Sequence, residues 1–214
     1  IMGTDYIIPS FIKAGIVKPL DKTKFDHWDA LLTSLRGNYY DPDNRYSIPY
    51  GWSVFGLGID TNAFNEPPDP TWDLLFKKNK APGKVGMIDD ARELASIALF
   101  YLFGDSVIPN AQQLNAVSQL LLKQKEWVAA YTDLRTDFLL ISHSAPVVLG
   151  ISPDIFHAKQ KYPTIDFVIP REGSFLMVDC FLLAKSTTKD EYIYQFLNYL
   201  YRPEVIEKYV NRFY

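Results

Sequence analysis

Short apolar runs that resemble β-strands alternate with segments of helical periodicity along most of this 214-residue chain. A strand-like run at 84–88 is followed by helix-like segments at 89–104 and 110–127, and a run at 146–151 precedes a helix-like 154–162. Apolar residues at helical spacing and short β-rich runs are the main signals of secondary structure in a sequence. Their alternation predicts an α/β fold.

Two extended runs, bent near Ile59 and near Asp179, cross between blocks of different character. We therefore expect two lobes joined by crossing strands: residues 1–58 as part of lobe I, 59–178 as lobe II and 179–214 as the return of lobe I. A ligand of such a protein belongs in the cleft between the lobes. Pro49 and three nearby glycines predict that the first crossing run is either an edge strand or a bent strand.

Several helices are predicted outside the alternating region. The segment 24–37 has apolar residues at helical spacing and a glycine at its end, which predicts one helix. A half-turn of helix is expected at 9–15 and a short helix at 72–76. The segment 189–213 is expected to form one or two amphipathic helices, broken before Pro203.

Charge and composition exclude several classes of protein. The net charge of −3 and the scattered basic residues do not suit a nucleic-acid partner. The single cysteine, Cys180, excludes an intrachain disulfide, and no apolar run approaches the roughly 18 to 20 residues of a membrane helix. Because the chain begins one residue before Met2 and ends on an aromatic residue, we expect a fragment, from which a signal peptide could have been removed.

No motif for catalysis or cofactor binding is evident. The chain has no nucleophile elbow, no phosphate loop and no dinucleotide fingerprint. Its histidines, His27, His143 and His157, are too far apart in sequence to suggest a metal site. We therefore expect neither an enzyme nor a metal or cofactor site.

Three acids, Asp89, Asp90 and Glu93, stand where the strand-like run 84–88 turns into a helix. An aspartate followed three residues later by a glutamate is a capping box, and acids suit the start of a helix. One cap suffices for one helix, however, so one of these acids could cap while another binds a cation.

Two further acids are open to both structural and functional interpretations. Asp154 follows a strand-like run and precedes a helix, which is typical of an N-cap. Asp179 lies inside an apolar run, where a carboxylate is costly to bury without a partner. Asp179 could face solvent at a strand end, pair with Arg171, or bind a ligand.

The aromatic residues and one hydroxyl are equally open to two interpretations. Tyr6, Trp52, Phe55 and Trp72 could offer ring faces to a cation, although core packing is the commoner role of such side chains. Thr4 could supply a hydroxyl group to a ligand or play no part in binding.

Five segments, taken in order over nearly the whole chain, resemble the bacterial polyamine-binding (spermidine/putrescine) solute-binding proteins of ABC importers. The segments lie at 13–25, 40–60, 83–93, 165–179 and 194–205. The resemblance implies a two-lobed, type II periplasmic-binding-protein-like fold that lacks both termini of the family. It also implies a periplasmic protein, or a lipoprotein anchored outside the cytoplasm, that delivers a polyamine to a membrane permease and works as a monomer.

The resemblance also implies which residues bind the ligand. Carboxylates of the family fall on Glu93, with Asp90 nearby, on Asp154 and on Asp179, so that Glu93 is interpreted as a ligand rather than a cap. The remaining positions are a hydroxyl, aromatic residues and walls of the site, and they fall on Thr4, Tyr6, Ile151, Met177 and Tyr214, the last with an uncertainty of one residue.

This chain departs from the family at two walls of the site. Ile151 and Met177 stand where the family places aromatic rings. Loss of ring faces weakens cation–π binding, so we expect a lower polyamine affinity or a different amine. The alternatives are a protein of the same fold for another solute, such as ferric ion, thiamine or an amino-acid derivative, or a ligand-sensing receptor module.

Overall fold

The computed structural model describes residues 1–104 and 108–213, which form two compact units. Unit 1 comprises Ile1–Ser53 and Leu176–Arg212, and unit 2 comprises Val54–Phe175. The lobe boundaries proposed from the sequence, after residues 58 and 178, lie a few residues beyond these divisions. The elements alternate between strands and helices, which confirms the α/β prediction.

Unit 1 is built on strand β8 (Leu176–Ala184). The strands β1 (Met2–Thr4) and β2 (Val17–Lys18) both pair with β8 in antiparallel orientation. Its helices are α1 (Ile8–Lys13), α7 (Asp190–Leu200) and α8 (Pro203–Phe213). The break before Pro203 and the short helix near residue 9 are therefore confirmed.

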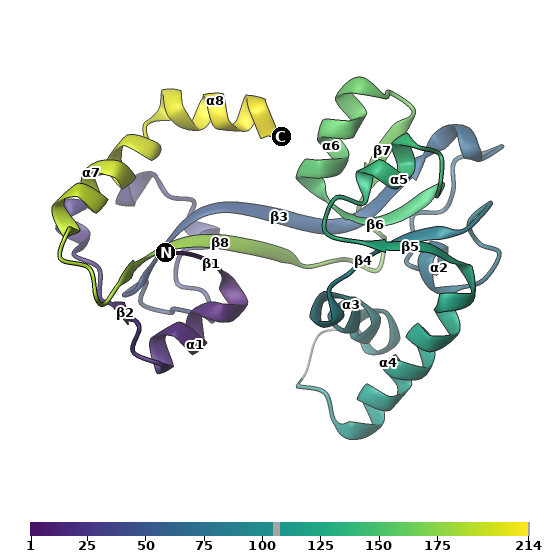
Figure 1. Cartoon of the computed structure of the whole chain (residues 1–214), viewed down its shortest axis with the longest axis horizontal. Helices are drawn as coiled ribbons and strands as arrows, with labels where there is room; N and C mark the ends of the chain where they lie inside the picture. Colours follow the sequence, from purple (N-terminus) through teal and green to yellow (C-terminus); the bar gives the residue numbers. More distant parts are fainter. Residues whose placement is uncertain (105–107, 214) are drawn as a thin grey trace. The chain divides into compact units, whose positions relative to one another are not determined.

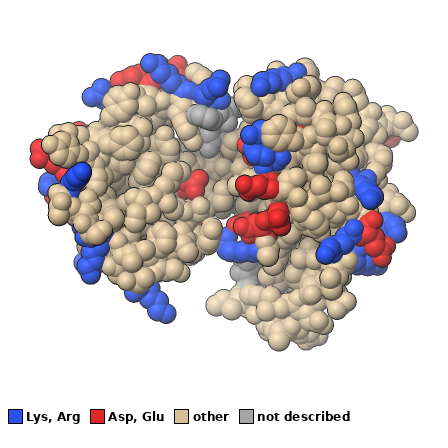
Figure 2. Space-filling model, viewed as in Figure 1, with Lys and Arg blue, Asp and Glu red and all other residues tan. Residues whose placement is uncertain are grey.

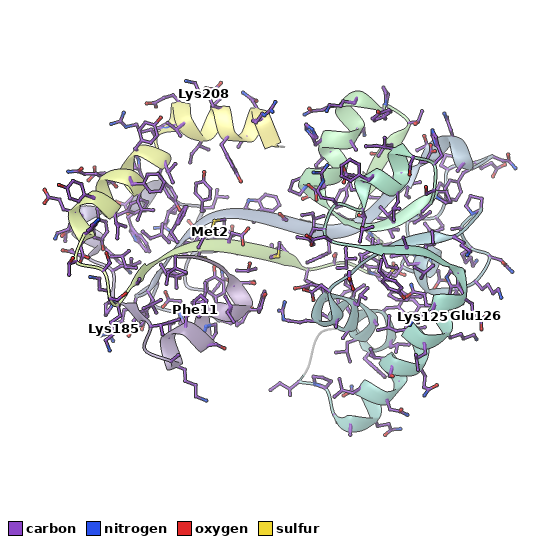
Figure 3. The ribbon with its side chains drawn as sticks, viewed as in Figure 1. Met2, Phe11, Lys125, Glu126, Lys185 and Lys208 are labelled. Atoms are coloured by element: carbon purple, nitrogen blue, oxygen red, sulfur yellow. The ribbon has the colours of Figure 1, made fainter. Side chains whose placement is uncertain are left out.

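The side chains of β8 alternate between two environments, as those of a strand must. Val178, Cys180 and Leu182 are buried in one core cluster, against which Phe11 packs from α1 (Figure 3). Asp179 and Phe181 point to the opposite face. The apolar run around Asp179 therefore does not bury it, since the residues beside it in sequence face the other way.

Unit 2 contains a sheet whose strand order is β3-β6-β4-β5, with β7 also paired to β3. The strands are β4 (Val85–Ile88), β5 (Val128–Thr132), β6 (Val147–Ile151), β7 (Ile165–Val168) and the second half of β3 (Ser47–Asp60). Strand β4 is parallel to both β5 and β6. Figure 1 shows α3 (Ala91–Phe103) and α4 (Ala111–Gln124) on one face, with α5 (Asp137–Ile141) and α6 (Ser152–Lys161) on the other. The short α2 (Asp73–Phe76) was also expected.

Strand β3 decides between the two interpretations of the glycine-rich run. It begins in unit 1 and ends in unit 2. Within unit 2 it pairs with β6 on one side and with β7 on the other. The edge-strand interpretation is therefore wrong, and the interpretation of a strand crossing between the units is confirmed.

The helix predicted over 24–37 does not form. Two 3-10 turns, Trp28–Ala30 and Thr33–Leu35, stand in its place. Phe25 is buried in a core cluster with residues of α7, and Leu31 packs against the same cluster. The apolar spacing is thus satisfied by tertiary packing of short turns rather than by a continuous helix.

The chain enters β3 through a loop that one buried carboxylate organises. Asp41 is 4% exposed and accepts hydrogen bonds from the backbone N–H groups of Arg45, Tyr46 and Ser47 and from the Ser47 hydroxyl. Four donors compensate the loss of hydration of this buried carboxylate. We infer that Asp41 fixes where β3 begins.

Replacing Asp41 with alanine should therefore destabilise unit 1. We expect Asp41→Ala to lower the free energy of unfolding by about 2 to 4 kcal/mol, because buried donors lose a charged acceptor. Urea denaturation followed by circular dichroism measures this change. The exposed Asp43 of the same loop is the matched control; an Asp41→Ala protein as stable as Asp43→Ala would contradict the role given to Asp41.

Candidate functional site

Acidic side chains gather at one edge of unit 2, where the parallel strands end. Strand β4 ends at Ile88, β5 at Thr132 and β6 at Ile151, and each is followed by the start of a helix. Because the three strands are parallel, their carboxyl ends meet at the same edge, which is the common location of ligand sites in α/β sheets. Figure 2 shows acidic side chains over the part of unit 2 from which α3 begins, with basic side chains beside them.

The sequence left two roles open for the acids after β4, capping α3 and binding a cation, and the structure distinguishes these acids. Asp90 is the N-cap of α3, and its Oδ1 accepts the backbone N–H groups of Arg92 and Glu93 at 2.9 Å each. The capping interpretation is confirmed for Asp90. Glu93 is only 7% exposed and forms an ion pair with the guanidinium of Arg92. Glu93 is thus a buried carboxylate beside a cation, and its role as a ligand remains a prediction.

Asp154 is not the cap of α6. The N-cap position is Ile151, so Asp154 lies within the first turn of the helix. Its side chain is 23% exposed, and its carboxylate Oδ1 lies 3.9 Å from Nε of Arg135. Burial, followed by the negative charge of Asp137, raises the pKa of Asp154 to about 6, against the opposing effect of Arg135. Asp154 is therefore a carboxylate whose charge its surroundings compensate only in part.

The segment after β5 holds an ion pair that sequence analysis missed. Asp137 is 1% exposed, and Arg135 donates to it through both Nε and Nη2 at 3.0 Å. The guanidinium also lies over the ring of Phe138, 4.4 Å from its centroid. Acids that follow a strand-like run were the signal used at 89–93, and the same signal at 133–137 would have found these residues.

Unit 1 has a candidate carboxylate of its own, with a hydroxyl partner. Asp179 on β8 is directly opposite Thr4 on β1, and the Thr4 hydroxyl donates to Asp179 Oδ1 at 2.9 Å. Arg171 is paired instead with Asp69, at 2.7 Å. The interpretation of Asp179 as the partner of Arg171 is therefore wrong; Thr4 and Asp179 are hydrogen-bonded neighbours, and their role in binding a ligand remains a prediction.

The aromatic candidates separate into core and surface residues. Trp72 and Phe55 are 0% and 1% exposed and belong to the core of unit 2, whereas Tyr6 and Trp52 in unit 1 are exposed at 41% and 44%. Of these four residues, only Tyr6 and Trp52 expose ring surface to solvent. Of the predicted walls, Met177 is half-buried and Ile151 is buried, while Tyr214 lies outside the described residues.

A tyrosine that sequence analysis did not single out feels the charge of Asp179. Tyr209 of α8 packs its ring against Tyr50, with centroids 5.3 Å apart. Burial raises the pKa of Tyr209, and the negative charge of Asp179 raises it further. In unit 1 the candidate carboxylate thus has the Thr4 hydroxyl as its hydrogen-bond partner, and its charge acts on Tyr209 of α8.

Within residues 1–104 and 108–213, no group of three or more histidine, cysteine, aspartate or glutamate side chains has a geometry that could hold a metal ion. In the same part of the chain, no helix is long and apolar enough to cross a membrane.

The raised pKa of Asp154 predicts a pH-dependent stability effect. A carboxyl group whose pKa is higher in the folded protein than the usual value of about 3.9 destabilises the folded state once it ionises. We expect Asp154→Asn to raise the free energy of unfolding of the ligand-free protein by about 1 to 3 kcal/mol at pH 8. The gain should shrink as the pH falls from about 6 toward 4.

Thermal unfolding at several pH values measures this gain. Asp69→Asn, in an exposed ion pair of the same unit, is the control and should have little effect at any pH. A variant Asp154→Asn that is less stable than the unaltered protein at pH 8 would contradict the account of a poorly compensated carboxylate.

Comparisons with known proteins place this chain among binding proteins. It is 31% identical to the putrescine/agmatine-binding protein of Pseudomonas aeruginosa over 96% of this chain and 60% of that protein. It is also 31% identical to the putrescine-binding periplasmic protein PotF of Escherichia coli, over 95% of this chain and 62% of that protein. The chain therefore spans about 60% of the length of these relatives.

Solved structures show the same fold. The lipoprotein TpPotD of Treponema pallidum aligns with a TM-score of 0.89 at 22% identity, over 99% of this chain and 67% of that one. A spermidine/putrescine ABC transporter substrate-binding protein, PotD from Streptococcus pneumoniae, aligns with a TM-score of 0.80 at 24% identity, over 95% and 62% of the two chains.

The family described as bacterial extracellular solute-binding protein matches residues 1–213, almost the full length of the sequence. The chain therefore belongs to the bacterial extracellular solute-binding protein family.

Proposed function

We propose that this protein binds a polyamine of the putrescine or spermidine type outside the cytoplasm and delivers it to an ABC importer. It acts as a binding protein and not as an enzyme. Its location is the periplasm, or the outer side of a membrane to which a lipid anchors it, and its partner is a permease. The relatives that carry putrescine in their names support this proposal, together with the charges described above.

The single observation that carries the proposal is the environment of Asp154. Its carboxylate is largely buried, lies beside the negative charge of Asp137 and is 3.9 Å from the nearest guanidinium nitrogen. An ammonium group would stabilise the ionised form of Asp154 through a charged hydrogen bond, an interaction worth about 1.5 to 3 kcal/mol. Unit 2 therefore offers a place for a cation.

A diamine has an ammonium group at each end and methylene groups between them. We propose that Asp179, assisted by Thr4, is the ammonium-binding carboxylate of unit 1, and that Asp154 and Glu93, with Asp90 nearby, are those of unit 2. Tyr6, Met177, Ile151 and Tyr214 are the proposed walls. Because Met177 and Ile151 replace aromatic rings, the binding of the methylene chain relies on apolar contact more than on cation–π attraction.

Calorimetric titration with putrescine, cadaverine and spermidine tests this function. We expect saturable binding of at least one amine and a loss of about tenfold or more in Asp179→Asn, because the amide removes the charged acceptor. The Thr4 hydroxyl can still donate to the amide oxygen, so the fold should be retained.

Asp69→Asn is the matched control for this titration and should bind like the unaltered protein. Absence of binding of all three amines to a folded, ligand-free protein would contradict the proposed function. Binding that is unaffected by Asp179→Asn would keep the function but remove Asp179 from the site.

Amine binding should also weaken in acid. As the pH falls through about 6, Asp154 takes up a proton and loses the charge that attracts the ammonium group. We expect the dissociation constant for putrescine to rise about tenfold between pH 7.5 and pH 5. The same titration of Asp154→Asn should give weaker binding that changes little over this range; an equally steep change in that variant would show that another group is responsible.

A further inference from the structure

Arg135 has two acidic neighbours, but it is committed to only one of them. Its Nε and Nη2 both donate to the Asp137 carboxylate at 3.0 Å, which is the two-pronged geometry that arginine and carboxylate favour. The ring of Phe138 supports the guanidinium from a third direction, 4.4 Å away. Asp137 is almost completely buried, so the acceptor of this pair is held at the start of α5, whereas the Arg135 side chain is 51% exposed.

The second acid, Asp154, lies just out of reach of the same guanidinium. The distance from Arg135 Nε to Asp154 Oδ1 is 3.9 Å, too long for a hydrogen bond. Asp154 projects from α6, which packs against α5, β6 and β7. The Nε proton that could serve Asp154 is already donated to Asp137.

The other charged groups around Asp154 do not replace that donor. Asp133, before Arg135 in the chain, adds a further negative charge. Lys159 of the same helix is paired with Asp166 of β7 at 2.7 Å. Asp154 therefore depends on whichever cation comes to it, either a rearranged Arg135 or an external one.

We propose that Asp137 is a positioning residue, which holds the Arg135 guanidinium away from Asp154 and thereby leaves Asp154 available to an ammonium group of the ligand. This inference rests on the proposed function and adds to it the reason why the Asp154 carboxylate stays available to the ligand. Neither Asp137 nor Arg135 needs to touch the ligand in this arrangement.

Substitution of Asp137 should weaken ligand binding, and further substitution of Arg135 should restore it. If Asp137 loses its charge, the guanidinium needs to move only about 1 Å to form a direct charged hydrogen bond with Asp154. A cation belonging to the protein would then occupy the position intended for the ligand. Replacing Arg135 as well should make Asp154 available to the ligand again. The second substitution should therefore restore the affinity that the first one lowers.

Calorimetric titration with putrescine at pH 8 tests the proposal in the unaltered protein, Asp137→Asn and the double variant Asp137→Asn/Arg135→Gln. We expect the dissociation constant to rise about tenfold or more in Asp137→Asn and to return to within about threefold of the original value in the double variant. Affinity in Asp137→Asn should also become insensitive to acidification to pH 5, because a close guanidinium keeps Asp154 ionised. Asp69→Asn is the control.

The outcomes separate this inference from the proposed function. If the unaltered protein binds no amine, both are wrong. If it binds, and a folded Asp137→Asn binds equally well, or the double variant stays as weak as the single one, the positioning role is wrong and the function stands. If thermal unfolding shows that Asp137→Asn does not fold, Arg135→Gln decides: it should keep the affinity within about threefold, and a tenfold loss would overturn the proposal.

Discussion

A carboxylate removed from water must find a cation or several donors, and this requirement explains how unit 2 is arranged. Glu93 is paired with Arg92, and Asp137 with Arg135. Asp154 has neither a direct ion pair of this kind nor a capping role. Its pKa of about 6 follows from that deficit, since burial and the charge of Asp137 outweigh the effect of the guanidinium. A protein that retains such a group tolerates a cost in the ligand-free state that a bound cation would remove.

The two units supply their carboxylates by different structural means. Unit 2 uses the shared edge at which parallel strands end and helices begin, so that residues distant in sequence are brought together. Unit 1 uses the alternation of β8, which buries Val178 and Cys180 on one face and leaves Asp179 on the other, beside Thr4 of the paired strand. Asp179 thus has a protein donor, the Thr4 hydroxyl, whereas Asp154 lies 3.9 Å from a guanidinium nitrogen that is bonded elsewhere.

Local signals in the sequence were sufficient for part of this structure. The strand–helix alternation depends on residues that are close in sequence and was predicted correctly; the Asp90 cap, which also depends on near neighbours, was one of two interpretations that the sequence left open. The helix over 24–37 was not predicted correctly, because Phe25 packs against α7 in the core of unit 1, a tertiary contact that overrides the local helical spacing. The acids around Arg135 carried the same local signal as those at 89–93, but the relation of the Arg135–Asp137 pair to Asp154 could not be predicted, because folding alone brings Asp154 near.

The resemblance to polyamine-binding proteins supplied what local reasoning could not. It selected Thr4 from the hydroxyl-bearing residues of the chain as a candidate for ligand binding; in the structure this hydroxyl donates to Asp179 at 2.9 Å, and its binding role remains a prediction. It also pointed to Ile151 and Met177 as departures from the family. The unequal division of Arg135 between two acids is a feature of the structure that the resemblance does not imply.

The central claim is that an ammonium group of the ligand and a proton compete for Asp154. Calorimetry of putrescine binding at pH 6, in buffers of different ionisation enthalpy, measures how many protons are released for each ligand bound. With the pKa of Asp154 at about 6, the account predicts release of about half a proton per putrescine in the unaltered protein and none in Asp154→Asn. Binding without proton release in the unaltered protein, or equal release in the variant, would contradict it.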